Sequence, residues 1–325
     1  MQSFAVRLLG ILLLAAFVLA GGFLSIRFRA ANRAVMLQTP ELPILPPAIP
    51  PDTLRLLSYN ISHARGPGHN APNTAGGTPE EKQARLETIG QQIGQLGLDL
   101  VALQNVDFNC WWSGGVDQAH IIARAAGFPY IVRQRNYDAG LPFYRRMDHG
   151  NVLLSRFPIS QIEKIPFPPH QNWENLLFGN PDALLAHVQI SETRVIRVLV
   201  TALDNRSEEI RVQATGEIIR VQRAASTPMI VMGTLHSTPP GFPDARTTLG
   251  GQNTIEVLES FGGFQRRPAR GQATFRDFTH PTEGPRRIID WILADPHFTF
   301  QHYEARRDFT ESNHLPVITT LRLRP

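Results

Sequence analysis

Cysteine and lysine are nearly absent from this sequence. Its 325 residues contain one cysteine, Cys110, which excludes an internal disulfide and a zinc site built from several cysteines. The two lysines are Lys82 and Lys164, so arginine provides almost all of the 32 basic side chains. Arginine favours bidentate contacts with phosphate or carboxylate groups. Without disulfides as a guide, the compartment has to be inferred from the N-terminal segment.

A strong excess of one charge is also lacking. A net charge of +4 and a pI near 9.6 are modest for this length, and they suit a polyanionic partner only weakly. The arginine pairs at 145–146, 266–267 and 286–287 are candidates for a basic stripe, although such pairs are more often solvated surface. Charge alone therefore leaves a nucleic-acid partner open.

The segment from Leu8 to Ile26 has no charged residue. About 20 apolar residues are what a helix needs to cross the core of a bilayer. Two interpretations stay open: a retained anchor, or a signal peptide that is cleaved after the small-residue pattern ending at Ala20. The anchor is favoured because the apolar run leads into a proline-rich stretch, 39–51, that is typical of a stiff spacer.

These features predict three parts of the chain: a signal-anchor or signal peptide at 1–29, a proline-rich linker at 30–51, and one globular domain at 52–325. The membrane is thus an expected partner, reached through the N-terminal helix. We expect the domain outside the cytoplasm by analogy with exported single-span proteins; the alternative is a secreted or periplasmic protein. The few arginines flanking the apolar run do not decide the orientation.

Short apolar runs alternate with amphipathic segments throughout the predicted domain. Leu54–Ile61 has the composition of a strand, and Thr78, Pro79 and Glu81 form the start signal of a long helix. Further strands are predicted at 100–106, 151–157, 183–190, 195–203, 229–233, 288–294 and 317–323, and helices at 118–126 and 207–224. Strands that alternate with helices, with several direct strand-to-strand connections, indicate an α/β sandwich.

Several of these strands end in polar residues, and the order and spacing of these segments along the chain are informative. The segments are Leu57-Ser58-Tyr59-Asn60, 100–106, Gly150–Ile159, 200–205, 231–239, 287–293 and 312–317. Together they resemble the endonuclease/exonuclease/phosphatase family, the deoxyribonuclease-like phosphohydrolases. The resemblance implies a four-layer α/β/β/α sandwich.

Most polar positions of the family's motifs are replaced. The resemblance implies that Asn60, Asp290 and His314 are retained members of the site, with Asp290 and His314 paired. The replaced positions are Asn105, where the family has its magnesium-binding glutamate, Ala202 for a histidine, Thr234 for an aspartate, His236 for an asparagine and Asn313 for an aspartate. The apolar flanks of these motifs are intact.

The resemblance implies a magnesium or manganese ion, but its ligands are largely lost. An amide at Asn105 offers one neutral oxygen where a hard cation prefers an anionic one. Asp107, two residues further on, would lie on the same face of a regular strand and is the candidate substitute ligand. A rebuilt zinc site is the alternative, drawing on His236, His314, Asp290 and Asp107 with His63 or His69.

Two functions follow from this pattern. The favoured hypothesis is a catalytically degenerate domain that binds a phosphate-containing ligand or a protein partner, with Asn60, Asn151 and Asn205 as candidate ligand contacts. The alternative is a metal-dependent phosphodiesterase or phosphatase with a rebuilt site, in which His314, Asp290 and His236 are the candidate catalytic residues.

Overall fold

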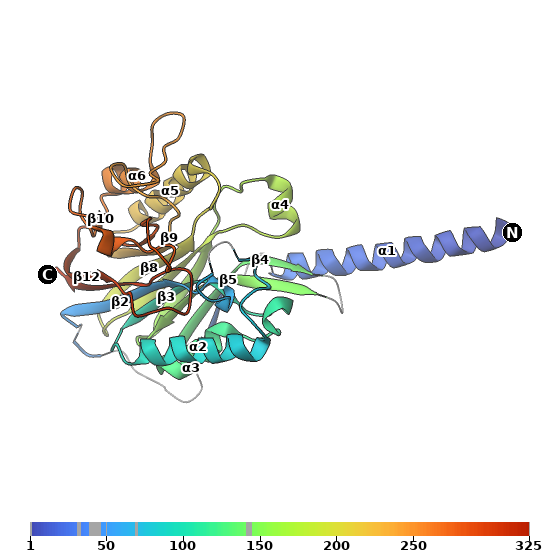
Figure 1. Cartoon of the computed structure of the whole chain (residues 1–325), viewed down its shortest axis with the longest axis horizontal. Helices are drawn as coiled ribbons and strands as arrows, with labels where there is room; N and C mark the ends of the chain where they lie inside the picture. Colours follow the sequence, from blue (N-terminus) through green and yellow to red (C-terminus); the bar gives the residue numbers. More distant parts are fainter. Residues whose placement is uncertain are drawn as a thin grey trace.

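The computed structural model describes residues 2–30, 34–38, 47–49, 51–68, 71–140 and 145–324, and most of its strands lie in two mixed sheets (Figure 1). The first sheet has the order β1 (Ala34–Gln38), β4 (Tyr130–Gly140), β5 (Arg146–Ser155), β3 (Leu100–Asp107), β2 (Thr53–Asn60), β13 (Val317–Leu323) and β12 (Phe298–Ala305). The second has the order β10 (Gln265–Arg266), β11 (Asp290–Ala294), β9 (Met229–Thr234), β8 (Val195–Ala202), β7 (Ala183–Gln189) and β6 (Ile159–Ile165).

Helices cover the outer face of each sheet. The first sheet carries α2 (Pro79–Gly94) and α3 (Gln118–Ala126), and the second carries α5 (Glu208–Arg223) and α6 (Thr254–Gly262), on opposite sides of the domain (Figure 1). Shorter helical turns are η1 (Ser62–Ala64), η2 (Trp111–Ser113), α4 (Asn172–Leu177) and η3 (Phe275–Asp277).

The main core lies between the two sheets. Leu56, Ala102 and Leu153 of the first sheet pack in one buried cluster with Val198 and Ile230 of the second. Full burial of one such aliphatic side chain stabilises a fold by about 1.5–3 kcal/mol. Two further clusters join the outer face of each sheet to its helices, so the layers run helix, sheet, sheet, helix. The predicted four-layer sandwich is confirmed.

Helix α2 shows how local signals set an element. Thr78 caps it with a complete capping box to Glu81, and Pro79 occupies its first turn. Its buried face contains Leu86 and Ile89, which pack on the first sheet. The helix begins where the sequence predicts.

Each sheet contains one parallel pair of strands. In the first sheet β2 pairs with β3, and in the second β8 pairs with β9; every other strand pair is antiparallel among the described residues. A helix lies between the two strands of each pair in the chain, as a parallel connection requires. The carboxyl ends of all four strands carry residues of the predicted site, at Asn60, Asn105, Ala202 and Thr234.

The N-terminal segment forms helix α1 (Gln2–Ala30), which projects from the domain (Figure 1). Its stretch Phe4–Ser25 is long and apolar enough to cross a membrane. Strand β1 then pairs antiparallel with β4, so this part of the predicted linker lies at the edge of the first sheet. Most of the predicted spacer, 39–46 and Pro50, lies outside the described residues.

Candidate functional site

The polar ends of the parallel strands meet across the two sheets. Asn60, at the end of β2, donates a hydrogen bond from Nδ2 to Oγ1 of Thr234, at the end of β9, over 3.0 Å. Both side chains are buried, with exposed fractions of 1% and 0%. The four-layer architecture thus joins positions that are 174 residues apart in the sequence.

The hydrogen-bond chain continues to a histidine–aspartate pair. Thr234 donates from Oγ1 to Oδ1 of Asp290 over 2.6 Å, and Nδ1 of His314 lies 2.9 Å from Oδ2 of the same carboxylate. Burial acts to raise the pKa of Asp290, but the charge and hydrogen bond of His314, with the Thr234 bond, outweigh it and hold that pKa below its ordinary value. Asp290 is therefore a carboxylate with both oxygens engaged.

Asn105, near the end of β3, is the predicted site residue next to Asn60. Its backbone is left-handed, with φ of 53°, beside an irregularity in the pairing of β3 with β5. Asparagine adopts this conformation more readily than most residues. The side-chain Nδ2 donates to Oδ1 of Asn60 over 3.1 Å, so two neutral amides face each other here.

These residues do not fit a magnesium ion. A hard cation prefers several anionic oxygens, whereas Asn60 and Asn105 offer neutral amides and Asp290 is already engaged. Within the residues that the structure describes, no three His, Cys, Asp or Glu side chains are grouped so that they could hold a metal ion. His69, a candidate zinc ligand, lies outside those residues.

A second histidine–aspartate pair, His63 with Asp107, lies across from the pair formed by His314 and Asp290. Nδ1 of His63 is 2.6 Å from Oδ1 of Asp107, while Oδ2 of Asp107 accepts hydrogen bonds from Nε1 of Trp112 at 2.8 Å and Nε2 of Gln118 at 3.3 Å. Burial acts to raise the pKa of Asp107, but the neighbouring His63 outweighs it and holds the pKa low. Asp107, proposed from sequence as a substitute metal ligand, is thus committed to His63 and its neighbours.

The turn that carries His63 has an unusual backbone. Ser62, His63 and Ala64 all have positive φ, at 47°, 58° and 56°. Three consecutive left-handed residues without glycine are unfavourable in isolation, so tertiary contacts must hold them. The hydroxyl of Ser62 donates to Oδ1 of Asn313, which ties this turn to the loop that carries His314.

Two further histidines are held neutral by their surroundings. Burial, reinforced by the nearby His63, lowers the pKa of His149 to about 3, and its ring stacks on Tyr137 at 4.8 Å. Burial, reinforced by His314, likewise lowers the pKa of His236 to about 3. Both imidazoles are therefore uncharged near neutral pH.

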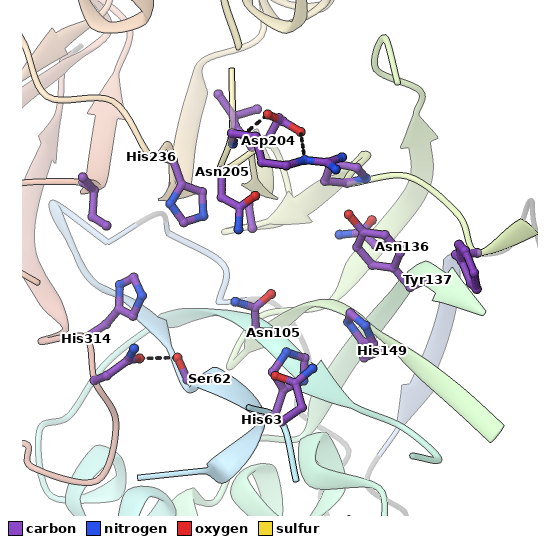
Figure 2. Close-up of a pocket in the computed structure, with 18 of the residues that line it drawn as sticks. Ser62, His63, Asn105, Asn136, Tyr137, His149, Asp204, Asn205, His236 and His314 are labelled. Atoms are coloured by element: carbon purple, nitrogen blue, oxygen red, sulfur yellow. Dashed lines mark hydrogen bonds and ion pairs between the residues drawn. The ribbon is translucent and has the colours of Figure 1, made fainter. Parts of the chain in front are cut away.

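These groups surround one pocket of about 800 Å³ (Figure 2). His314 and His236 stand on one side and His63 and His149 on the other, with Asn105 between them. The predicted site residues that line the pocket are Asn105, Ala202, Asn205, His236, Asn313 and His314. Asn60, Thr234 and Asp290 lie buried beneath them in the hydrogen-bonded chain.

Asn151, a predicted ligand contact, is buried away from the pocket lining. It is 1% exposed, and its Nδ2 donates to Oε1 of Gln134 and to the carbonyl oxygen of Asp182, both over 3.0 Å. These bonds tie β5 to β4 and to the start of β7, and Asn151 is not part of the pocket lining.

The pocket lining carries charges of both signs. Three arginines, Arg65, Arg206 and Arg287, line it together with two carboxylates, Glu174 and Asp204. Arg206 binds Glu174 with both terminal nitrogens, at 3.0 and 2.5 Å. Arg287 contacts Nδ1 of His280 over 3.0 Å.

Sequence reasoning did not single out several lining residues. They include His149, His280, Tyr137, Trp173 and the three arginines as pocket residues. One usable signal was present: His149 directly precedes the segment Gly150–Ile159, the best motif match in the chain. Arg287 opens the motif segment 287–293, whereas Tyr137 on β4 and Trp173 on α4 lie outside the motif segments.

The fold and the pocket define a class of protein: an α/β/β/α sandwich with polar residues at the carboxyl ends of its parallel strands. The sequence profile of the endonuclease/exonuclease/phosphatase family matches residues 57–314. The chain belongs to this family. Among curated proteins, no sequence matches it.

Solved structures confirm the fold. An endonuclease/exonuclease/phosphatase from Bacteroides vulgatus is similar with a TM-score of 0.60 and 16% identity, over 84% of this chain and 99% of that one. The human nocturnin catalytic domain with bound sulfate gives 0.59 and 15%, over 90% and 97%. A protein of the same family from Beutenbergia cavernae gives 0.56 and 20%, over 84% and 72%.

Proposed function

We propose that this chain is a membrane-anchored member of the family that binds a phosphate-containing ligand in the pocket and has lost magnesium-dependent hydrolysis. The observation that carries this is the neutral network that Asn105 and Thr234 form with Asn60, since the family resemblance implies carboxylates at the first two of these positions. It lies beneath a pocket lined by arginine, histidine and asparagine side chains.

The pocket supplies donors for an anion. His314 turns Nδ1 toward Asp290, which leaves Nε2 for a ligand, and Asn205, Asn313 and Arg287 line the same cavity. Hydrogen bonds from charged donors to phosphate are among the stronger ones in proteins. Two structural neighbours support this ligand class: human nocturnin carries a bound sulfate, and another is a mannosyl-6-phosphatase from Bacteroides thetaiotaomicron.

Loss of magnesium-dependent chemistry follows from the same residues. Thr234 is not a base near neutral pH, and its hydroxyl is hydrogen-bonded to Asp290. Removal of a general base typically lowers a rate by about 10²- to 10⁴-fold. Loss of the carboxylate at Asn105 removes charge stabilisation as well, so the ordinary reaction of the family is not expected.

Anchoring by α1 is the second part of the proposal. The apolar stretch Phe4–Ser25 supports a single span. We place the domain outside the cytoplasm by analogy with exported single-span proteins. Binding of nucleic acid has less support. Arg266, from one of the arginine pairs, is 3% exposed with Nε 3.0 Å from Glu259, and Arg145, from another, lies over the ring of Trp111.

Calorimetry with inorganic phosphate tests the binding function. The full-length chain in detergent should bind phosphate equally well with and without EDTA. Arg287→Gln should weaken binding about tenfold or more, because a hydrogen bond to a charged group contributes about 1.5–3 kcal/mol. Arg220→Gln, on the exposed face of α5, is the matched control. Magnesium-dependent hydrolysis of a phosphodiester by the wild-type chain would overturn the proposal.

A hydrolase with a rebuilt site is the second candidate, and one observation favours it. Two imidazoles, His63 and His314, each place Nδ1 on a buried carboxylate and line the same pocket. Such a pair can act as general acid and general base. Turnover of bis(p-nitrophenyl) phosphate in EDTA, lost in His63→Ala and His314→Ala, would establish this candidate over simple binding.

A further inference from the structure

Helix α4 presents an unusual group of exposed apolar side chains. Trp173 is 57% exposed, Leu176 65%, Leu177 38% and Phe178 39%, and no residue of α4 is buried. Single exposed apolar residues are normal on a protein surface, but a contiguous group of four marks a contact site. We call these four residues the α4 patch.

The α4 patch is held firmly by the domain. The carbonyl oxygen of Phe178 accepts a hydrogen bond from the amide of Asp138 over 2.8 Å, and Gly179 forms a bridge with Tyr137. At the other end, Glu174 is bound by both terminal nitrogens of Arg206. The α4 patch is therefore fixed to the domain by backbone and side-chain hydrogen bonds.

The membrane-spanning candidate enters the domain at the same place. Strand β1 runs antiparallel to β4, with Ala34 opposite Gln134 and Gln38 opposite Tyr130. The N-terminal end of β1 therefore points toward the half of β4 that contains Tyr137, where the α4 segment is attached, and α1 itself contacts β4. Figure 1 agrees, because α4 lies on the side of the domain from which α1 projects.

The chemistry of this face suits a lipid surface. Tryptophan concentrates at the membrane–water interface, while leucine and phenylalanine enter the acyl region. Arg145, which lies 4.0 Å over the 41% exposed ring of Trp111, directly precedes β5 beside the same strand end. The next residue, Arg146, is engaged by Asp138 and Asp148. Basic side chains near a bilayer are attracted to anionic lipid headgroups.

We propose that the α4 patch docks into the headgroup region of the bilayer and forms a second membrane contact beside α1. Trp173, Glu174 and Phe178 also line the pocket, so this docking places the mouth of the pocket at the layer of lipid headgroups. The proposal rests on the membrane anchoring in the proposed function. A second copy of the chain is a less suitable partner for the α4 patch, because a bilayer that holds α1 would already lie against this side of the domain.

Site-specific fluorescence in the full-length chain tests the docking. Native Cys110 is buried, so a single introduced cysteine can be labelled with an environment-sensitive fluorophore. Leu176→Cys is the test position, and Leu249→Cys, in a loop on the second sheet's side and 103% exposed, is the matched control. Each variant is reconstituted at one chain per nanodisc that contains anionic lipid and nitroxide-labelled acyl chains.

The label at position 176 should shift its emission to shorter wavelength and be quenched by the nitroxide lipids, while the label at 249 should do neither. Equal, water-like signals at both positions in chains that comigrate with the discs would overturn the docking and leave the anchor intact. A chain that does not comigrate with the discs would overturn the anchor itself, and the docking with it.

Intrinsic tryptophan fluorescence gives a readout without labels. Brominated lipids should quench the wild-type chain more than Trp173→Phe, because that substitution removes the one tryptophan of the α4 patch. Quenching that is unchanged by Trp173→Phe would count against the docking even if the label at position 176 were shielded.

Discussion

The two histidine–aspartate pairs of the pocket share their geometry but differ in their surroundings. In each, the imidazole offers Nδ1 to a buried carboxylate. Asp290 accepts a hydrogen bond from the hydroxyl of Thr234, and that hydroxyl in turn accepts one from the amide of Asn60. Asp107 instead bonds to Trp112 and Gln118, which belong to the helical layer of the first sheet. One carboxylate is supplied by β11 of the second sheet and the other by β3 of the first sheet.

The two carboxylates are both occupied by neighbouring side chains. Asp290 accepts a hydrogen bond from Thr234 and contacts His314, and Asp107 contacts His63, Trp112 and Gln118. A buried carboxylate near this pocket is therefore not by itself an indication that a metal ion can bind there.

The largest expected effect is on stability at the Asp107 pair. Asp107→Ala removes the acceptor of the Trp112 indole N–H, one of the two acceptors of the Gln118 amide, and the partner of the buried His63. Breaking a buried pair in this way destabilises a protein by about 3–5 kcal/mol. Urea denaturation of the full-length chain measures the change, with exposed Glu192→Ala as control. A change below that of the control would show that the second pair is not structural.

The neutral His149 makes the free energy of unfolding depend on pH. The pKa of His149 is about 3 in the folded chain, whereas an unfolded histidine titrates near 6.5. Because the unfolded state binds more protons, stability should fall as the pH drops below about 6.5, by about 2 kcal/mol between pH 7 and pH 5. His149→Phe keeps the stacking on Tyr137 and should remove this part of the slope. An unchanged slope in urea midpoints against pH would refute the assignment.

At the Asp290 pair, substitution should have a smaller effect on stability. Asp290→Asn retains an oxygen that can accept from Thr234, and it replaces a charged hydrogen bond to His314 by a neutral one. We expect a loss of about 1–2 kcal/mol in the free energy of unfolding, and a smaller relative change in phosphate affinity. If the melting temperature stays constant while binding disappears, Asp290 serves the ligand directly and not the fold.

The smallest expected effect is that of Asn105→Glu, which introduces the carboxylate that the family resemblance implies at this position. Asn105→Glu supplies one anionic oxygen, but Thr234 and Asn313 remain neutral, so only weak magnesium binding should return. The variant should gain thermal stability on addition of magnesium, by roughly 1 kcal/mol at a concentration a few times the dissociation constant. The wild-type chain is the control and should not respond. A wild-type chain that responds equally would mean that the native site already binds magnesium.

Much of the fold was predictable from local pattern. Helix α2 has a full capping box and a periodic apolar face, and α3 closes at Gly127 as predicted. Strands β4, β6 and β12 and helices α4 and α6 were not predicted. Strand β4 contains five polar residues among its eleven, and α4 spans six residues, too few for a periodic pattern. Their structure depends on neighbours that the local sequence does not reveal.

The candidate site likewise contains contacts that the sequence predicted and contacts that it did not. Asp290 and His314 were paired correctly from the family motifs, since these motifs fix both residues at ends of core elements. Asn151 belongs to an equally good motif, yet it bonds between strands and stays outside the pocket lining. The pairing of Asp107 with His63 depends on the irregular pairing of β3 and on a left-handed turn, and neither has a sequence signature.

Alternating strands and helices were enough to predict an α/β sandwich, and an uncharged run was enough to predict the N-terminal apolar helix, because both follow from local periodicity and composition; the four-layer order came from the family resemblance. The tertiary structure alone decided where the remaining carboxylates point, that two imidazoles share one pocket, and that the exposed α4 patch lies beside the end of β4 from which α1 departs. Those contacts join residues far apart in the chain, and their geometry depends on how the two sheets pack.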